Sequence, residues 1–443
     1  MQDLTKGKVG SLILKFAIPL LIGNVFQQLY NIVDSLVVGN FLGKDALAAV
    51  GASFPVIFAL ISLIIGIATG TTIIIAQYFG ARDYENVKRA IDTMYIFTFG
   101  ASIFVSALGI YFTEDIFRLL QLPEDIMPEA ISYLRVYLAG MVVFFGFNGN
   151  SAVLRGLGDS KTPLYFLIVA SILNIALDLL FILVFGWGVA SVALATVISQ
   201  GVAFVSAIIY LNRNHSIIQF SLTKWSFDRK IFAKSIRIGL PSGFQHTFVA
   251  LGMMALMGLV NTFGTNVIAA YSVAQRIESL AMMFAFNFAM ALTSFTGQNI
   301  GAGKYDRVKT GLRSTLVMGS MITIGITTIY ILFGNQIMEL FTPDADVIST
   351  GTRYLNIVSP FYIAFTAMFI IGGVMRGAGD TLIPMFLTLF SLWVVRIPLA
   401  FILSARMGET GIWWSIPIGW MSGMLLSWFY YLTGKWKSKG VTS

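Results

Sequence analysis

The sequence predicts an all-α integral membrane protein whose twelve transmembrane helices form two six-helix bundles, arranged as parallel repeats around a central cavity. Composition, long apolar runs and an internal repeat carry this prediction. Of the 443 residues, 57% are hydrophobic and only 11% are charged, which leaves too little polar surface to cover a water-soluble globule. With no cysteine and two histidines, the chain offers little basis for a disulfide, a zinc centre or a histidine-based catalytic triad.

Twelve predominantly apolar runs follow one another, each long enough to cross about 30 Å of hydrocarbon as a helix. The runs are continuous rather than alternating, which favours helices over a barrel of strands. The first run has no small-residue cleavage site after it, so we expect a retained span and not a signal peptide. In chain order the expected spans are 14–41, 46–79, 87–112, 130–154, 163–186, 188–211, 236–263, 266–300, 310–333, 350–375, 383–404 and 411–433.

Positive charge is concentrated in alternate connections between these spans. Most of the 29 lysines and arginines fall on the side that also carries both termini, and cytoplasmic connections retain such an excess. The opposite connections contain only Lys44, Arg118, Arg135, Arg353 and Arg406. We therefore expect both termini in the cytoplasm, and the net charge of +8 indicates membrane topology and not nucleic-acid binding.

Two loop sequences occur twice with the same displacement. RGLGDSKTP begins at Arg155 and RGAGDTLIP at Arg376, while QYFGARDYENVK covers 77–88 and QNIGAGKYDRVK covers 298–309. Each half has an even number of spans, so both halves enter the membrane from the same side, and parallel halves favour a cavity along their seam. The expected domains are an N-terminal six-helix bundle at 1–212, a cytoplasmic linker at 213–235 and a C-terminal six-helix bundle at 236–443.

Acidic side chains inside the expected spans point to a cation site. Helical rise places Asp34, Asp178 and Thr196 roughly 10–12 Å below the outer surface, and Asn174 lies one turn from Asp178 on the same helix face. Carboxylate, amide and hydroxyl oxygens suit a small alkali cation or a shared proton. Two neighbouring carboxylates in a low dielectric cannot both stay bare anions. Alternatively, each acid is satisfied separately by a hydroxyl or backbone partner.

The second half lacks these oxygen ligands. The positions 221 residues further along are Ala255, Val395, Leu399 and Pro417. The predicted cation site, Asp34, Asn174, Asp178 and Thr196, therefore belongs to the N-terminal half alone.

Other intramembrane side chains allow more than one interpretation. Arg276 and Glu278 point to different helix faces, which favours structural ion pairs with other helices. Arg396 either extends toward the interface or pairs with an acid. The expected substrate cavity residues are Gln245, Met253, Met257, Met282 and Met283. Flexible thioethers suit varied guests, although ordinary helix packing explains them equally.

The duplicated six-span halves and the paired loops resemble the multidrug and toxic compound extrusion (MATE) family over nearly the whole chain. This resemblance implies a prokaryotic plasma (inner) membrane transporter, functional as a monomer and without a cofactor, that exports small cationic amphiphilic compounds in exchange for Na⁺ or H⁺. The family's first-span aspartate matches Asp34, and its N-terminal cation site matches Asn174, Asp178 and Thr196. Spans 7 and 10 lack the acids of some members, which indicates a branch without them.

Three alternative classes of membrane protein fit the sequence less well. A lipid-linked saccharide flippase of a related fold would need a strongly cationic lumen, whereas Arg276 and Arg396 are the arginines that lie away from the ends of the expected spans. A major-facilitator transporter also has six plus six spans, but its loop pattern fits GARDYENVKRA poorly. An integral membrane enzyme would need a nucleophile and base or a metal cluster at one depth, and the sequence offers neither.

Overall fold

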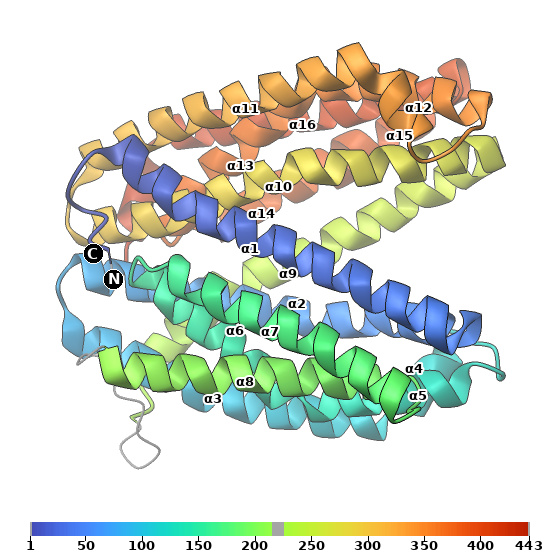
Figure 1. Cartoon of the computed structure of the whole chain (residues 1–443). Coiled ribbons are helices and arrows are strands. Elements are labelled where there is room, and N and C mark those ends of the chain that lie inside the picture. The colour runs from blue at the N-terminus through green and yellow to red at the C-terminus, as the bar shows by residue number, and fades with distance from the viewer. Residues whose placement is uncertain (1, 215–225, 442–443) are drawn as a thin grey trace. The chain divides into compact units, whose positions relative to one another are not determined.

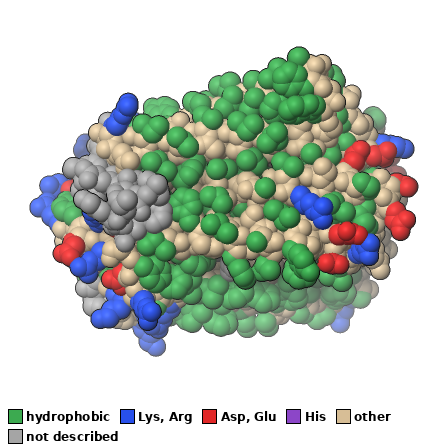
Figure 2. Space-filling model, turned by 90° about the horizontal axis from the view of Figure 1, so that it is seen from below, with side chains coloured by type: hydrophobic (Ala, Val, Ile, Leu, Met, Phe, Trp, Pro, Cys, Tyr) green, Lys and Arg blue, Asp and Glu red, His purple; other side chains and the backbone are tan. Residues whose placement is uncertain are grey.

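The computed structural model describes residues 2–214 and 226–441, and within these ranges the chain forms helices and no strands (Figure 1). A helix satisfies its own backbone N–H and C=O groups, as a bilayer without hydrogen-bonding solvent requires. Figure 2 shows hydrophobic side chains over the middle of one face, with most charged side chains toward its ends. The predicted all-α membrane class is confirmed.

Each of the twelve predicted spans corresponds to helical segments in the described part of the chain. Ten helices have the length and apolar composition of a span, and the bent pair α5 and α6, with an angle of 49°, makes an eleventh. The twelfth is α16, whose 24 residues extend about 36 Å and whose tryptophan, tyrosine and serine content lowers its mean hydropathy. The helices are α1 (Val9–Val37), α2 (Lys44–Gly80), α3 (Tyr84–Tyr111), α4 (Thr113–Leu119), α5 (Met127–Ala139), α6 (Met141–Gly156), α7 (Lys161–Leu179), α8 (Ala190–Asn214), α9 (Arg229–Val260), α10 (Thr265–Gly301), α11 (Tyr305–Glu339), α12 (Ala345–Val358), α13 (Tyr362–Gly377), α14 (Leu382–Leu389), α15 (Ile397–Met407) and α16 (Glu409–Leu432).

The chain divides into two compact units, which we call unit 1 and unit 2. Unit 1 comprises residues 1–2 and 19–243, and unit 2 comprises residues 3–18 and 244–443. Helix α1 changes unit at Pro19, and α9 changes unit just after Pro241. Proline interrupts the helical hydrogen-bond ladder and favours a bend. Residues 215–225 of the predicted linker lie outside the described ranges, and the predicted domain boundaries stay a prediction.

The two halves repeat individual hydrogen bonds at the 221-residue displacement. Thr72 Oγ1 donates to the carbonyl of Ala152 over 3.0 Å in unit 1, and Thr293 Oγ1 donates to that of Gly373 over 3.1 Å in unit 2. The paired loops also share their backbone conformation. Gly158 and Gly379 both have positive φ, 83° and 94°, a conformation that glycine adopts without steric cost and that ends the preceding helix.

The aspartates of the two repeated loops make different hydrogen bonds in the two halves. Asp159 Oδ1 accepts hydrogen bonds from the backbone N–H of Lys161 (3.1 Å) and of Thr162 (3.0 Å), at the start of α7. Asp380 Oδ2 instead accepts a hydrogen bond from the Tyr430 hydroxyl at 2.5 Å. The second aspartate therefore ties its loop to α16 rather than capping α14.

Unit 1 contains a close crossing of α2 and α9. A Cβ atom on Gly66 would lie 2.5 Å from the backbone nitrogen of Gly243, and one on Gly70 would lie 2.6 Å from the carbonyl oxygen of Ser235. Small residues let transmembrane backbones approach closely, and dispersion contacts then replace the hydrophobic effect as the main source of association. This crossing fixes the first part of α9 within unit 1.

Unit 2 holds the N-terminal segment through the connection between α10 and α11. The guanidinium of Arg307 donates to the carbonyl oxygens of Leu4 (3.2 Å) and Gly7 (3.1 Å), and Lys304 Nζ donates to that of Thr5 at 3.0 Å. The backbone N–H of Leu4 donates to Gln298 Oε1 at 2.9 Å. These bonds anchor the segment in the repeated loop of the second half.

Candidate functional site

The two predicted acidic residues each lie close to the end of an α-helix that continues as a π-helical segment. Asp34 lies in α1 before the segment Val38–Leu42, and Asp178 lies in α7 before the segment Leu180–Val184. The two π-helical segments contact each other. Such segments re-aim nearby side chains and occur frequently at functional sites, so the local backbone helps to bring the two acids together.

Asp34 and Asp178 are direct electrostatic neighbours. Asp178 is fully buried at 0% exposure, and neither of its carboxylate oxygens has a hydrogen-bond partner. Oδ1 of Asp34 is also buried without a partner. Two carboxylates in a low dielectric repel each other unless one is protonated or a cation lies between them. One proton shared between the two carboxyl groups, or a bound cation, would satisfy the pair.

Asn174 lies one helical turn from Asp178 on α7, and both Asn174 and its neighbour Thr196 are buried. Asn174 Nδ2 donates to Thr196 Oγ1 at 3.2 Å, and the Thr196 hydroxyl donates to the carbonyl oxygen of Val192 at 3.0 Å. With its amide nitrogen engaged, Asn174 leaves Oδ1 buried and without a hydrogen-bond partner. Unpartnered oxygens from three side chains, with the Thr196 hydroxyl beside them, are the donor set of a hard monovalent cation or of a shared proton.

The acid pair is surrounded by three tyrosines that were not among the predicted site residues. Asp34 interacts electrostatically with Tyr30, Tyr133 and Tyr137, and the Tyr30 hydroxyl interacts with Thr196. The Tyr133 and Tyr137 rings stack in turn, with centroids 6.3 Å apart. A signal existed for Tyr30, which precedes Asp34 by four residues and so shares its helix face. For the two tyrosines of α5, depth in the membrane alone does not predict that they lie beside Asp34.

The described residues contain no group of three or more His, Cys, Asp or Glu side chains that could hold a metal ion. Transition-metal sites use such groups.

The residues predicted to line a substrate cavity lie on α9 and α10 of unit 2. Gln245 Nε2 donates to Thr388 Oγ1 at 2.9 Å. Met253, Met257 and Met282 are partly buried and pack against the hydrophobic core of unit 2. The carbonyl oxygen of Met283 accepts a hydrogen bond from the Asn287 side chain at 2.7 Å. These contacts fit ordinary helix packing, and the cavity assignment stays a prediction.

The structure resolves the open alternatives for the charged residues of the second half. Arg276 is exposed, whereas Glu278 and Arg396 are 5% and 4% exposed. Arg396 therefore turns inward, and its electrostatic partner is Glu278. Glu278 also accepts a hydrogen bond from the Tyr354 hydroxyl.

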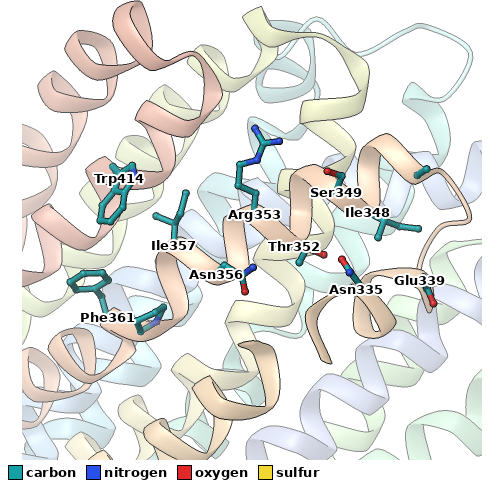
Figure 3. A pocket seen from close by; sticks show the side chains of 12 residues that line it. Asn335, Glu339, Ile348, Ser349, Thr352, Arg353, Asn356, Ile357, Phe361 and Trp414 are labelled. Carbon is teal, nitrogen blue, oxygen red and sulfur yellow. The ribbon is translucent and has the colours of Figure 1, made fainter. Parts of the chain in front are cut away.

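A cavity of about 690 Å³ opens between α11, α12 and α16, and none of the predicted site residues lines it (Figure 3). Asn335 and Glu339 lie at one end, and Phe361 and Trp414 lie at the other, so a polar end faces an apolar end. Arg353 borders the cavity and pairs with Glu409 at 3.3 Å. The opposite face of α12 carries buried residues, which include Tyr354.

The repeated halves and the membrane-spanning helices of the described residues define the protein as a multi-pass membrane protein. Comparison with known proteins specifies this further. The sequence model of the MatE family matches residues 19–180 and 241–402, once in each half. The chain therefore belongs to the MATE family.

Individual relatives match over almost their whole length. The chain is 34% identical to "Probable multidrug resistance protein YpnP" of Bacillus subtilis over 98% of both chains. It is 26% identical to "Probable multidrug resistance protein NorM" of Thermotoga maritima, over 97% of this chain and 93% of that one. A solved structure described as the outward-facing conformation of a multidrug resistance MATE family transporter matches with a TM-score of 0.91 and 28% identity, over 98% of both chains.

These matches make the protein a transporter of small molecules and not an enzyme, as the sequence predicted. Efflux is the class of transport that the multidrug resistance relatives indicate. None of these relatives is described as a flippase, so the alternative of a lipid-linked saccharide flippase gains no support.

Proposed function

We propose that the protein is a secondary active multidrug efflux transporter that exports cationic amphiphilic compounds in exchange for Na⁺ or H⁺ bound at Asp34, Asn174, Asp178 and Thr196. The buried acid pair is the observation that carries this proposal. Both carboxylate oxygens of Asp178 and Oδ1 of Asp34 are buried without hydrogen-bond partners, and a proton or a cation would stabilise them. No resident cofactor takes part.

Exchange follows if the acid pair binds its ion with different affinity in two conformations of the transporter. An ion can shift a conformational equilibrium only by this difference in affinity. Asp34 lies on α1, a helix with Pro19 inside it, so a change of ionic occupancy at Asp34 acts on a helix that already favours a bend. Release of a bound organic cation would accompany arrival of the coupling ion.

The remaining assignments support the same scheme. We infer that both termini are cytoplasmic, because the basic connections share one side, and that the functional unit is a monomer in a prokaryotic plasma membrane. A substrate cavity that Gln245 and the four predicted methionines would line completes the proposal. Small organic cations and the bilayer are the partners.

Ethidium transport into everted membrane vesicles tests the coupling. Vesicles are energised by a Na⁺ gradient, by a pH gradient or by neither, and uptake is followed by fluorescence. Asp34→Asn and Asp178→Asn each keep the volume and remove the negative charge, so gradient-driven uptake should fall to the level of empty vesicles at unchanged expression.

Asp45→Asn is a suitable control, because Asp45 is an exposed acid in the first turn of α2. This variant should transport as the wild type does. Undiminished gradient-driven uptake by the double variant Asp34→Asn/Asp178→Asn would refute the proposal. Dependence on one gradient alone would identify the coupling ion.

A further inference from the structure

Unit 2 contains a buried charge cluster that the proposed exchange does not use. Arg396 ends the π-helical segment Phe390–Arg396 and is 4% exposed. One of its terminal nitrogens faces the Met253 sulfur at 3.8 Å, and its Nε has no hydrogen-bond partner. A guanidinium is almost never buried so completely without a compensating anion.

Glu278 of α10 supplies that anion. It is an electrostatic neighbour of Arg396 and accepts a hydrogen bond from the Tyr354 hydroxyl. No ion pair of the described residues within 4.0 Å includes either group. Tyr271 interacts with the Arg396 guanidinium, and its ring packs against that of Tyr354 with centroids 5.8 Å apart. Two tyrosines therefore link the separated charges.

The remaining titratable groups beside Glu278 are also tyrosines. Tyr330 of α11 and Tyr362 of α13 are its electrostatic neighbours. The Tyr330 hydroxyl donates to the carbonyl oxygen of Ile277 at 2.9 Å. Among the described residues that interact with Glu278, Arg396 is thus the cation that compensates it.

The cluster occupies a position related by the repeat to the acid pair of unit 1. The counterpart of Asp34 is Ala255, two residues from Met253, and the counterpart of Asp178 is Leu399, three residues from Arg396. The same pair of spans therefore meets in each half. In unit 1 the meeting point carries two acids, and in unit 2 it carries a guanidinium against a thioether.

We propose that Arg396 is a tethered counter-ion for Glu278, which takes the place of an exchangeable cation and so restricts ion exchange to unit 1. The proposal rests on the proposed exchange at Asp34 and Asp178 for its functional meaning. The electrostatic part of the proposal does not depend on that exchange. It states that Glu278 binds no exchangeable proton or Na⁺ while the Arg396 guanidinium is present. Without Arg396, a buried carboxylate would remain that must acquire a proton or a cation.

Equilibrium ion binding to the purified full-length chain tests this assignment. Na⁺ binding is measured by titration calorimetry with choline as the reference cation, and proton uptake or release with a pH dye at several pH values. The background is Asp178→Asn, in which the acid pair of unit 1 is broken. Adding Arg396→Met should create a saturable Na⁺-binding or proton-binding event that the background lacks, and further addition of Glu278→Gln should abolish it.

Two controls separate charge from packing. Arg396→Lys keeps the positive charge and should create no new event, and Arg406→Met removes an exposed arginine of α15 and should change nothing. A folded Arg396→Met variant without a new event, or an event that persists with Glu278→Gln, overturns the proposal.

A second measurement covers the case in which Arg396→Met does not fold. Glu278→Gln alone, in the wild-type background, should leave the number of ion-binding events unchanged, and loss of an event would overturn the proposal. Failure of the proposed exchange at Asp34 and Asp178 has a different outcome from failure of the Arg396 proposal. In that case the Asp178→Asn background would bind ions as the wild type does.

Discussion

Gly66→Ala tests the close crossing of α2 and α9. The added Cβ atom would lie 2.5 Å from the backbone nitrogen and 2.7 Å from the Cα atom of Gly243, and 2.7 Å from the carbonyl oxygen of Gly239. Favourable carbon contacts lie at about 3.5–4.0 Å, so the helices must separate by roughly 1 Å. All three contacted atoms belong to backbone, and no side-chain rotation relieves the overlap. Overpacking of this kind costs about 1–3 kcal/mol of unfolding free energy.

Gly100→Ala in α3 provides the matched control. A Cβ atom there meets nothing within 4 Å, and alanine in a helix interior is more stable than glycine by about 0.5–1 kcal/mol. Both glycines lie inside helices, so this gain applies to both variants and cancels, and Gly66→Ala should be less stable than Gly100→Ala by about 1–3 kcal/mol.

Reversible unfolding of the purified chain in mixed micelles, followed by tryptophan fluorescence, measures this difference. A Gly66→Ala variant as stable as the wild type would refute the packing argument. Equal destabilisation by both variants would also refute it, because the crossing of α2 and α9 would then contribute nothing to the effect of the added methyl group.

Two further predictions concern the N-terminal anchor and the cation site. Arg307→Ala removes the guanidinium that donates hydrogen bonds to the carbonyl oxygens of Leu4 and Gly7. Loss of these charged hydrogen bonds should lower the local stability of the N-terminal segment by about 1.5–3 kcal/mol. Hydrogen exchange at the backbone amides of residues 4–7 should therefore accelerate, and unchanged exchange would contradict the assigned anchoring. Thr196→Val removes the hydroxyl that orients the Asn174 amide. Loss of one such hydrogen bond, about 1 kcal/mol, should weaken binding of the coupling ion several-fold in titration calorimetry, whereas equal affinity would show that the amide needs no orientation.

Much of the fold follows from apolar periodicity and the repeat. The 221-residue displacement predicted equivalent halves, and the paired bonds from Thr72 and Thr293 confirm that equivalence at the level of single atoms. The helical breaks were not predictable in the same way. Hydropathy does not distinguish an α-helical turn from a π-helical one, so the segments after Asp34 and Asp178 left no signal in the sequence.

The sequence predicted the depth of the candidate site residues in the membrane, but not the direction in which their side chains face. Counting residues from the span ends placed Asp34 and Asp178 at one level, whereas their facing depends on how helices rotate about their own axes. The same limit concealed Tyr133 and Tyr137, whose positions along α5 say nothing about which neighbour they face. For Arg396 the sequence left two orientations open, because a long side chain near a span end can reach the interface or turn inward.

The change of unit within α1 and α9 bears on where the chain can be divided. Residues 3–18 belong to unit 2, and residues 229–243 of α9 belong to unit 1. A cut at the sequence boundary between the two repeats would therefore separate each compact unit from one of its own segments.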